Sequence, residues 1–182
     1  MSASYVAIIT DGNGRWAQQR GLSVAEGHEA GADTVKARLR DAADLGIREL
    51  TVYSFSTENW SRDPEEVAAL MEMFSERILA ETPELHEEGV RMRFIGRREG
   101  VAPELVEQME WAERTTAANE RITLFVAFNY GGRAEIVDAA RASRSHQRPP
   151  KRRRRASNSA RAASRSARPK SGHSTSVKTS SE

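Results

Sequence analysis

Large apolar side chains are confined to the first 140 residues of this chain, which limits where a hydrophobic core can form. Among the 182 residues, no aromatic residue follows Tyr130, and Val177 is the only large aliphatic residue after position 140. A segment without such side chains cannot bury enough apolar surface to offset the conformational entropy that folding removes. We therefore predict one folded domain in residues 1–142 and a disordered basic tail in residues 143–182.

The charge of the chain changes sign at the same place. Residues 1–140 hold 15 Lys and Arg against 25 Asp and Glu, whereas residues 141–182 hold 13 Lys and Arg and one acidic residue. The basic run at residues 151–155 could attract the phosphates of nucleic acid or acidic lipid. It has no interleaved aromatic residues on which bases could stack. A solvated tail without specific nucleic-acid binding is the simpler interpretation.

The residue types also limit which metal ion the protein could bind and where in the cell it could be. The chain has no cysteine, so a metal ion could bind only through oxygen or imidazole, which favours magnesium over zinc. Residues 1–9 are too short for the apolar core of a signal peptide, and no apolar run approaches the roughly 18 residues of a membrane span. We expect a cytoplasmic protein with peripheral membrane contact at most.

Short apolar runs alternate with helical patterns along the domain. This alternation predicts an α/β fold, with a mostly parallel sheet and helices on both faces. The expected strands are residues 5–10, 49–54, 90–95 and 122–128, and the expected helices are residues 28–45, 64–81, 103–118 and 134–142. The helix from residue 64 has the clearest start, because Asp63 can cap it and Glu66 has capping-box spacing. Since ligands bind beyond the carboxyl ends of parallel strands, three loops become candidates, at residues 11–16, 56–62 and 129–133.

The first candidate loop, Asp11-Gly12-Asn13-Gly14-Arg15-Trp16, combines the parts of a diphosphate cradle. Its carboxylate could hold Mg²⁺, its glycines let backbone N–H groups approach a ligand, and its arginine suits bidentate phosphate contact. An exposed turn or a fragment of a calcium loop is the alternative. The calcium interpretation is weakened because the spaced acidic ligands of such a loop do not follow.

The other polar positions leave the same kind of choice open. The loop Ser56-Thr57-Glu58-Asn59-Trp60-Ser61-Arg62 could form part of a site, or be an ordinary polar loop that ends in a helix cap. His28 could donate to a phosphate oxygen, although a lone histidine at a helix start is more often a cap or a surface residue. Residues 129–133 could form a phosphate loop, but a Gly-Gly turn between strand and helix is the simpler interpretation.

Four phrases of the sequence, taken together and in this order, resemble the cis-prenyltransferase family of the undecaprenyl diphosphate synthase type. They are DGNGRWA at residues 11–17, GH at residues 27–28, FSTENW at residues 55–60 and NYGGR at residues 129–133. The resemblance covers about residues 5–142. It implies a homodimeric enzyme that condenses isopentenyl diphosphate with an allylic diphosphate, such as farnesyl diphosphate, into a cis-polyprenyl diphosphate, the precursor of a carrier lipid.

The resemblance also implies roles for single residues. Asp11 would hold Mg²⁺ and help the diphosphate to leave. Asn59 would assist proton removal from the isopentenyl unit, and because a carboxamide is a poor base we expect it to position a water or a diphosphate oxygen. The allylic diphosphate would be bound by Gly12, Asn13, Gly14 and Arg15 at a helix N-terminus, with further contacts from His28 and Arg62. Ser56, Thr57 and Glu58 would shape the site, Trp16 and Trp60 would pack near the substrate, and helix 64–81 would wall a tunnel for the growing chain.

Two departures from the family pattern bear on substrate binding. Val24 occupies a position where the family usually has an arginine that contacts the diphosphate, which should weaken binding by about 1–3 kcal/mol. The sequence also lacks an Arg-Thr-Ser-Gly-Glu-like stretch, which in the family holds isopentenyl diphosphate. The tail has the composition that GC-rich codons give when read out of frame, so a frameshift near Ala142 is one hypothesis, and an impaired enzyme is expected.

Two other functions remain compatible with the sequence. The chain could be a non-catalytic member that partners a complete subunit, although it keeps the catalytic loop that accessory subunits usually lack. It could also be an anion-binding remnant that acts through its basic tail.

Overall fold

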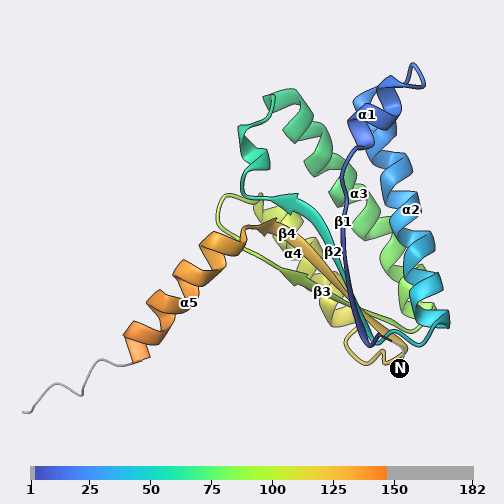
Figure 1. Ribbon diagram of the computed structural model, residues 1–182. Helices are drawn as coiled ribbons and strands as arrows, with labels where there is room; N and C mark the ends of the chain where they lie inside the picture. Colours follow the sequence, from blue (N-terminus) through green and yellow to red (C-terminus); the bar gives the residue numbers. More distant parts are fainter. Residues whose placement is uncertain (1–2, 147–182) are drawn as a thin grey trace, which may run out of the picture. The chain divides into compact units, whose positions relative to one another are not determined.

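The computed structural model of the protein describes residues 3–146, and these form a parallel four-stranded sheet with helices (Figure 1). The strand order is β1-β2-β4-β3. The strands are β1 (Tyr5–Ile9), β2 (Glu49–Ser56), β3 (Val90–Ile95) and β4 (Ile122–Tyr130); the helices are α1 (Asn13–Gln18), α2 (Val24–Asp44), the 3-10 turn η1 (Asn59–Ser61), α3 (Pro64–Glu87), α4 (Pro103–Thr115) and α5 (Gly132–His146).

One face of the sheet carries the hydrophobic core. Leu50, Leu124 and Met92 stand side by side in the register of β2, β4 and β3, and all three are buried. Their chain neighbours Thr51 and Phe125 point to the opposite face, where they are half-buried. Side chains alternate between faces along a strand, so the apolar residues at alternate positions of these strands build a single core layer.

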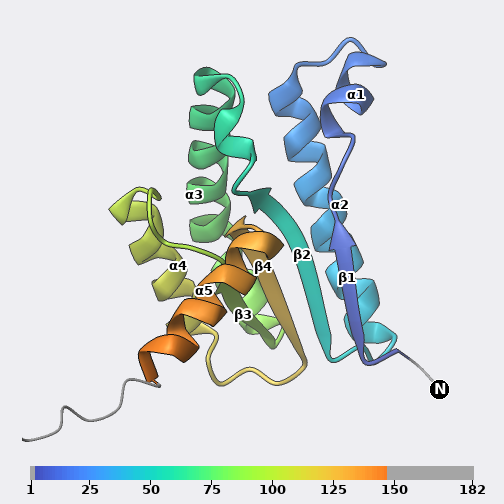
Figure 2. The same ribbon diagram turned by 60° about the vertical axis from the view of Figure 1, so that its left-hand side comes forward.

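Helices α2, α3 and α4 all contribute to this core (Figure 2). They supply Leu39 from α2, Leu70, Ile78 and Leu85 from α3, and Leu105, Met109 and Ala112 from α4. Helix α4 also covers the outer edge of β3. There the Thr116 hydroxyl, just after the helix, accepts a hydrogen bond from the Met92 amide at 3.0 Å, and Glu113 Oε1 accepts one from the Phe94 amide at 2.7 Å.

Helix α5 leaves the carboxyl end of β4 and is attached by a few polar contacts. Asp138 accepts two hydrogen bonds from the Arg97 guanidinium, at 2.8 and 2.9 Å. The apolar side chains Ile136 and Val137 remain 72% and 45% exposed. In the described part of the chain, α5 is therefore held at the sheet by charge rather than by apolar packing.

The predicted α/β fold with a mostly parallel sheet is confirmed, while several element bounds differ. Helix α2 begins at Val24, because Ser23 and Glu26 form a capping box that precedes the first apolar residue of the periodic pattern. The predicted loop after β1 contains the short helix α1. Helix α5 continues to His146, past the predicted domain boundary at residue 142, and the rest of the predicted tail lies outside the described residues. Among the described helices, none is long and apolar enough to cross a membrane.

Candidate functional site

The sheet brings the three polar loops predicted from the sequence to one edge. β1, β2 and β4 are neighbours and run parallel, so the loops that follow them lie together. Hydrogen bonds join these strand ends. Thr10 Oγ1 donates to the carbonyl oxygen of Tyr53 at 2.8 Å, and the Thr57 amide donates to that of Tyr130 at 3.0 Å.

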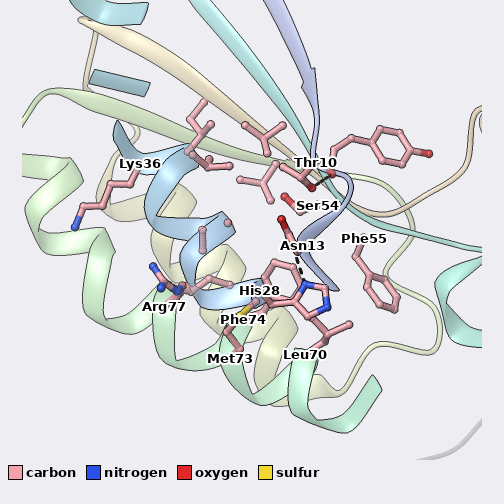
Figure 3. Close-up of a pocket in the computed structure, with 18 of the residues that line it drawn as sticks. Thr10, Asn13, His28, Lys36, Ser54, Phe55, Leu70, Met73, Phe74 and Arg77 are labelled. Atoms are coloured by element: carbon pink, nitrogen blue, oxygen red, sulfur yellow. Dashed lines mark hydrogen bonds between the residues drawn. The ribbon is translucent and has the colours of Figure 1, made fainter. Parts of the chain in front are cut away.

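A cavity of about 330 Å³ begins at these loops and continues between the sheet and helices α2 and α3 (Figure 3). Its polar end is lined by Asp11, Asn13, His28, Ser56, Asn59 and Arg62. Most of its remaining wall is apolar, with Val35 and Leu39 from α2, Val52 from β2, and Leu70, Phe74 and Ile78 from α3. Such a cavity matches a ligand that has a polar head and an apolar body.

Asp11 and Arg15 lie at the start of helix α1. Gly12 precedes this helix with φ of 86°, a left-handed conformation that glycine adopts without strain. The chain then turns so that Arg15 Nη2 donates to Asp11 Oδ2 at 3.2 Å. Their side chains are 75% and 79% exposed. Both charges therefore remain accessible to an anion or a metal ion from solvent.

Asn13 lies against helix α2 because two glycines on that helix leave room for it. A Cβ atom added to Gly27 would stand 2.5 Å from the carbonyl oxygen of Asn13 and 2.9 Å from the Cβ atom of Ala17. A Cβ atom added to Gly31 would stand 2.6 Å from Asn13 Nδ2. Asn13 Nδ2 also lies 3.5 Å from His28 Nδ1, at the outer limit of hydrogen bonding (Figure 3). The close packing of α1 on α2 thus fixes this amide at the polar end of the cavity.

His28 faces the cavity from helix α2, with its side chain 17% exposed. Glu66 Oε1 lies 3.7 Å from His28 Nε2 and accepts a hydrogen bond from Arg62 Nη1 at 2.9 Å. Burial lowers the pKa of His28 and the positive charge of Arg62 lowers it further, while Glu66 acts in the opposite direction. With a pKa below its usual value, the imidazole is neutral at pH 7. It can donate one N–H to a ligand oxygen.

The loop after β2 is closed by its own side chains. Asn59 Oδ1 accepts a hydrogen bond from the Ser56 amide at 2.8 Å. Since the oxygen of this amide is occupied, its NH₂ group is what Asn59 can offer to the cavity. Thr57 packs against Gly131, where an added Cβ atom would stand 2.5 Å from Thr57 Oγ1.

Several predicted site residues lie beside the cavity rather than in its wall. Trp16 is 39% exposed on α1, with the Arg20 guanidinium 4.4 Å above its ring. Trp60 packs edge-on against Phe55, with ring centroids 5.1 Å apart. Val24 is 45% exposed in the first turn of α2. The cavity wall also excludes Gly12, Gly14, Arg15, Thr57 and Glu58.

Sequence reasoning missed several charged residues that line or border the cavity, among them Glu66 and Arg77. Glu66 was expected in a capping box, but Asp63 Oδ1 accepts the cap hydrogen bond from Glu65 N, and the Glu66 carboxylate turns to Arg62 and His28. Arg77 lines the cavity from α3 (Figure 3). It forms ion pairs with Glu29 and Asp33 of α2 and with Glu81 of its own helix. The ion pairs with Glu29 and Asp33 link α3 to α2, the two helices that line the cavity. No local pattern in the sequence predicts these pairs.

The side chains that could hold a metal ion are few. Within residues 3–146, no three His, Asp or Glu side chains are grouped closely enough to hold an ion. Asp11 offers one exposed carboxylate at the mouth of the cavity. Mg²⁺ is commonly bound by one or two carboxylates together with substrate phosphates and water. The donors present therefore fit Mg²⁺ that arrives with a phosphorylated ligand.

Comparisons with known proteins agree with this geometry. A sequence model of the family described as "Putative undecaprenyl diphosphate synthase" matches residues 9–179. An isoprenyl transferase of Caulobacter vibrioides is 51% identical over 138 residues, which make up 76% of this chain and 53% of that protein. A ditrans,polycis-undecaprenyl-diphosphate synthase of Pseudomonas aeruginosa, described as (2E,6E)-farnesyl-diphosphate specific, is 48% identical over 136 residues, or 75% and 54% of the two chains. The chain thus spans about half the length of the curated relatives it matches.

Two solved structures of related proteins resemble this chain in fold. The crystal structure of lavandulyl diphosphate synthase from Lavandula x intermedia, in complex with dimethylallyl diphosphate, superimposes with a TM-score of 0.76 at 33% identity, over 79% of this chain and 62% of that one. A probable undecaprenyl diphosphate synthase from Campylobacter jejuni, 22% identical, shares the fold with a TM-score of 0.68 over 84% and 66% of the two chains.

Proposed function

Because the chain belongs to the undecaprenyl diphosphate synthase family, we propose that it binds an allylic diphosphate and carries one half of an isoprenyl transferase site. The observation that carries this proposal is the cavity, which has polar residues at the sheet edge and apolar residues between α2 and α3. An allylic diphosphate has the matching division into an anionic head and an apolar chain. Farnesyl diphosphate, which the Pseudomonas aeruginosa relative is described as using, is the first candidate.

The polar end supplies donors suited to a diphosphate head. Arg62 lines this end, and Arg15 lies beside it, paired with Asp11. Both carry positive charges that can bind phosphate oxygens in bidentate fashion. Neutral His28 adds one N–H and Asn59 adds its NH₂ group. Asn13, which is fixed against α2, holds a further amide next to His28. These groups would hold the head while the apolar chain extends along α3.

Asp11 is the residue that would hold Mg²⁺, as its exposed carboxylate at the cavity mouth suggests. When bound, the ion would supply positive charge to the leaving diphosphate. Arg15 would share this task, since it lies 3.2 Å from the same carboxylate. Asn59 would place a water or a diphosphate oxygen near the proton that the incoming unit loses, because an amide orients a base better than it acts as one.

We also propose that this chain condenses isopentenyl diphosphate poorly. Its sequence has no Arg-Thr-Ser-Gly-Glu-like stretch, the motif that the family resemblance assigns to the second diphosphate. Condensation requires both substrates to be held in near-attack geometry, so loss of one clamp removes much of the advantage of proximity. The implied homodimer and a peripheral membrane contact remain predictions.

Two measurements test the two parts of this proposal separately. Calorimetric titration with a non-reactive farnesyl diphosphate analogue and Mg²⁺ should show weak binding, and a folded chain that does not bind would refute the allylic site. Incorporation of labelled isopentenyl diphosphate should be undetectable. It should return when residues 143–182 are replaced by the C-terminal part of a complete family member. Polyprenyl product from the chain as it stands would show that the second clamp is supplied in another way.

A further inference from the structure

The side-chain amide of Asn129, near the end of β4, joins the loops that follow β2 and β3 at the carboxyl edge of the sheet. Its side-chain Nδ2 donates to the carbonyl oxygens of Arg97 and Glu99, at 3.1 and 3.0 Å, in the loop between β3 and α4. Its Oδ1 accepts a hydrogen bond from Trp60 Nε1 at 2.8 Å. Asn129 is 4% exposed and has φ of 49°. This buried amide is therefore bonded on both its oxygen and its nitrogen.

The partner Trp60 lies between two residues that line the cavity. Asn59 precedes it in η1 and Arg62 follows shortly after, and both reach the polar end of the cavity. The indole ring packs edge-on against Phe55, and its N–H is fixed by Asn129. Two contacts of Trp60 thus determine the orientation of η1: the apolar contact of its ring with Phe55 and the hydrogen bond of its N–H to Asn129.

We propose that Asn129 is a positioning residue that acts through Trp60 to hold Asn59 and Arg62 at the cavity. The inference rests on the proposed function, because it assigns Asn129 to the same diphosphate-binding end. Asn129 lies outside the cavity wall, so it would influence a ligand only by way of the loop that it anchors.

The chemistry of the position accounts for asparagine. The carbonyl oxygens of Arg97 and Glu99 require N–H donors, and the indole N–H of Trp60 requires an acceptor. A single carboxamide supplies both, because its NH₂ group donates two hydrogen bonds and its oxygen accepts one. An aspartate would accept from Trp60 but would face two carbonyl oxygens without a donor. Asparagine also tolerates the left-handed backbone better than most residues.

Trp60→Phe gives the primary test, because phenylalanine keeps an aromatic ring against Phe55 while it removes the indole N–H, together with the second ring of the indole. The reporter is the Ser56 amide, whose hydrogen bond to Asn59 Oδ1 records where Asn59 lies. Its exchange with solvent, followed by NMR, should become about fivefold faster, as expected for the loss of one hydrogen bond that supports the loop. The Phe94 amide of β3, which donates to Glu113 Oε1 of α4, serves as the internal control and should not change.

Asn129→Gly, which fits the backbone conformation, should accelerate Ser56 exchange by a similar factor, and the double variant should show no further increase. Affinity for inorganic diphosphate with Mg²⁺ should fall about fivefold in both single variants, whereas Trp111→Phe in α4 should leave it unchanged. Unchanged Ser56 exchange in Trp60→Phe would overturn the proposal, even if Asn129→Gly fails to fold. If the wild-type chain does not bind diphosphate, the proposed function fails, and Ser56 exchange still decides whether Asn129 positions the loop.

Discussion

Gly31 of α2 lies so close to Asn13 that a Cβ atom at position 31 would stand 2.6 Å from the Asn13 amide nitrogen and 2.7 Å from its amide oxygen. The atoms in the way are the end of a side chain, which can turn aside. Gly31→Ala should therefore leave the free energy of unfolding nearly unchanged, yet displace Asn13 from the cavity. We expect affinity for inorganic diphosphate with Mg²⁺ to fall about fivefold, the effect of one lost hydrogen bond.

Gly27, one helical turn earlier, provides the matched comparison. A Cβ atom there would meet the backbone oxygen of Asn13 at 2.5 Å and Ala17 at 2.9 Å, and neither can move without shifting α1. Gly27→Ala should therefore lower the free energy of unfolding by about 1–3 kcal/mol, the usual cost of overpacking. Chemical denaturation of both variants checks the contrast, and equal losses of stability would contradict it.

Arg15→Ala should affect binding far more than stability. Its described ion pair, with Asp11, is exposed on both sides, and such pairs contribute about 0–1 kcal/mol to folding. A charged hydrogen bond to a diphosphate is stronger, so affinity for a farnesyl diphosphate analogue should fall about 10- to 100-fold. Arg38→Ala removes a comparable exposed pair with Asp41 at 2.9 Å. Neither residue of this pair lines the cavity, whereas Asp11, the partner of Arg15, does, so Arg38→Ala should leave affinity unchanged. A similar loss in both variants would indicate long-range charge rather than a specific contact.

Acid should destabilise the folded chain partly through His28. Burial lowers the pKa of His28 and the charge of Arg62 adds to this effect, so the unfolded chain binds the proton more readily than the folded one. The resulting stability is present above the unfolded pKa, near 6.5, and is lost as the pH falls through the lower, folded pKa. Denaturation at pH 7.5 and 5.5 should therefore show a smaller decline for His28→Gln than for the wild type. An identical decline would mean that other groups account for the acid sensitivity.

Arg77→Met should loosen the contact between α2 and α3. The side chain of Arg77 is 19% exposed and serves Glu29, Asp33 and Glu81 together, so its removal leaves three carboxylates without this partner. We expect the free energy of unfolding to fall by about 1–2 kcal/mol, between the values for exposed and buried pairs. Arg114→Met removes one 3.5 Å pair with Glu110 that is 68% and 54% exposed, and it should change stability by less than about 0.5 kcal/mol. An equal effect of both substitutions would argue against a role of the Arg77 network in holding the helices.

Local patterns predicted the strands, the order of the elements and the loops that form the polar end of the cavity. Hydrophobic periodicity depends only on residues that are close in the sequence, so it can be read without a structure. The loops followed from the general rule that ligands bind beyond the carboxyl ends of parallel strands. The start of α2 could also have been found, since Ser23 and Glu26 have capping-box spacing. The prediction began this helix at His28 instead, because it relied on helical periodicity and not on the cap.

Residues whose role depends on distant partners could not be predicted in this way. Glu66 has the spacing of a cap residue, but the charges of His28 and Arg62 determine where its carboxylate points. Asn129 stands before a Gly-Gly turn, and its partners come from loops after β2 and β3. Gly27 and Gly31 are needed only because α1 packs closely on α2 and leaves no room for a Cβ atom at either position.

The side chains of Thr116 and Glu113 accept hydrogen bonds from backbone amides along the outer edge of β3. These amides are therefore not available to pair with a further strand. An edge strand with free amides and carbonyls is a template for adding another strand, which is how many proteins begin to aggregate. Here the β3 side is obstructed by the end of a helix, whereas β1, within residues 3–146, pairs only with β2 and leaves Tyr5 and Ile9 largely exposed. Strand addition, whether by a foreign peptide or in aggregation, is therefore directed to the β1 side, and a charged residue introduced at position 7 of β1 would be the simplest way to oppose it.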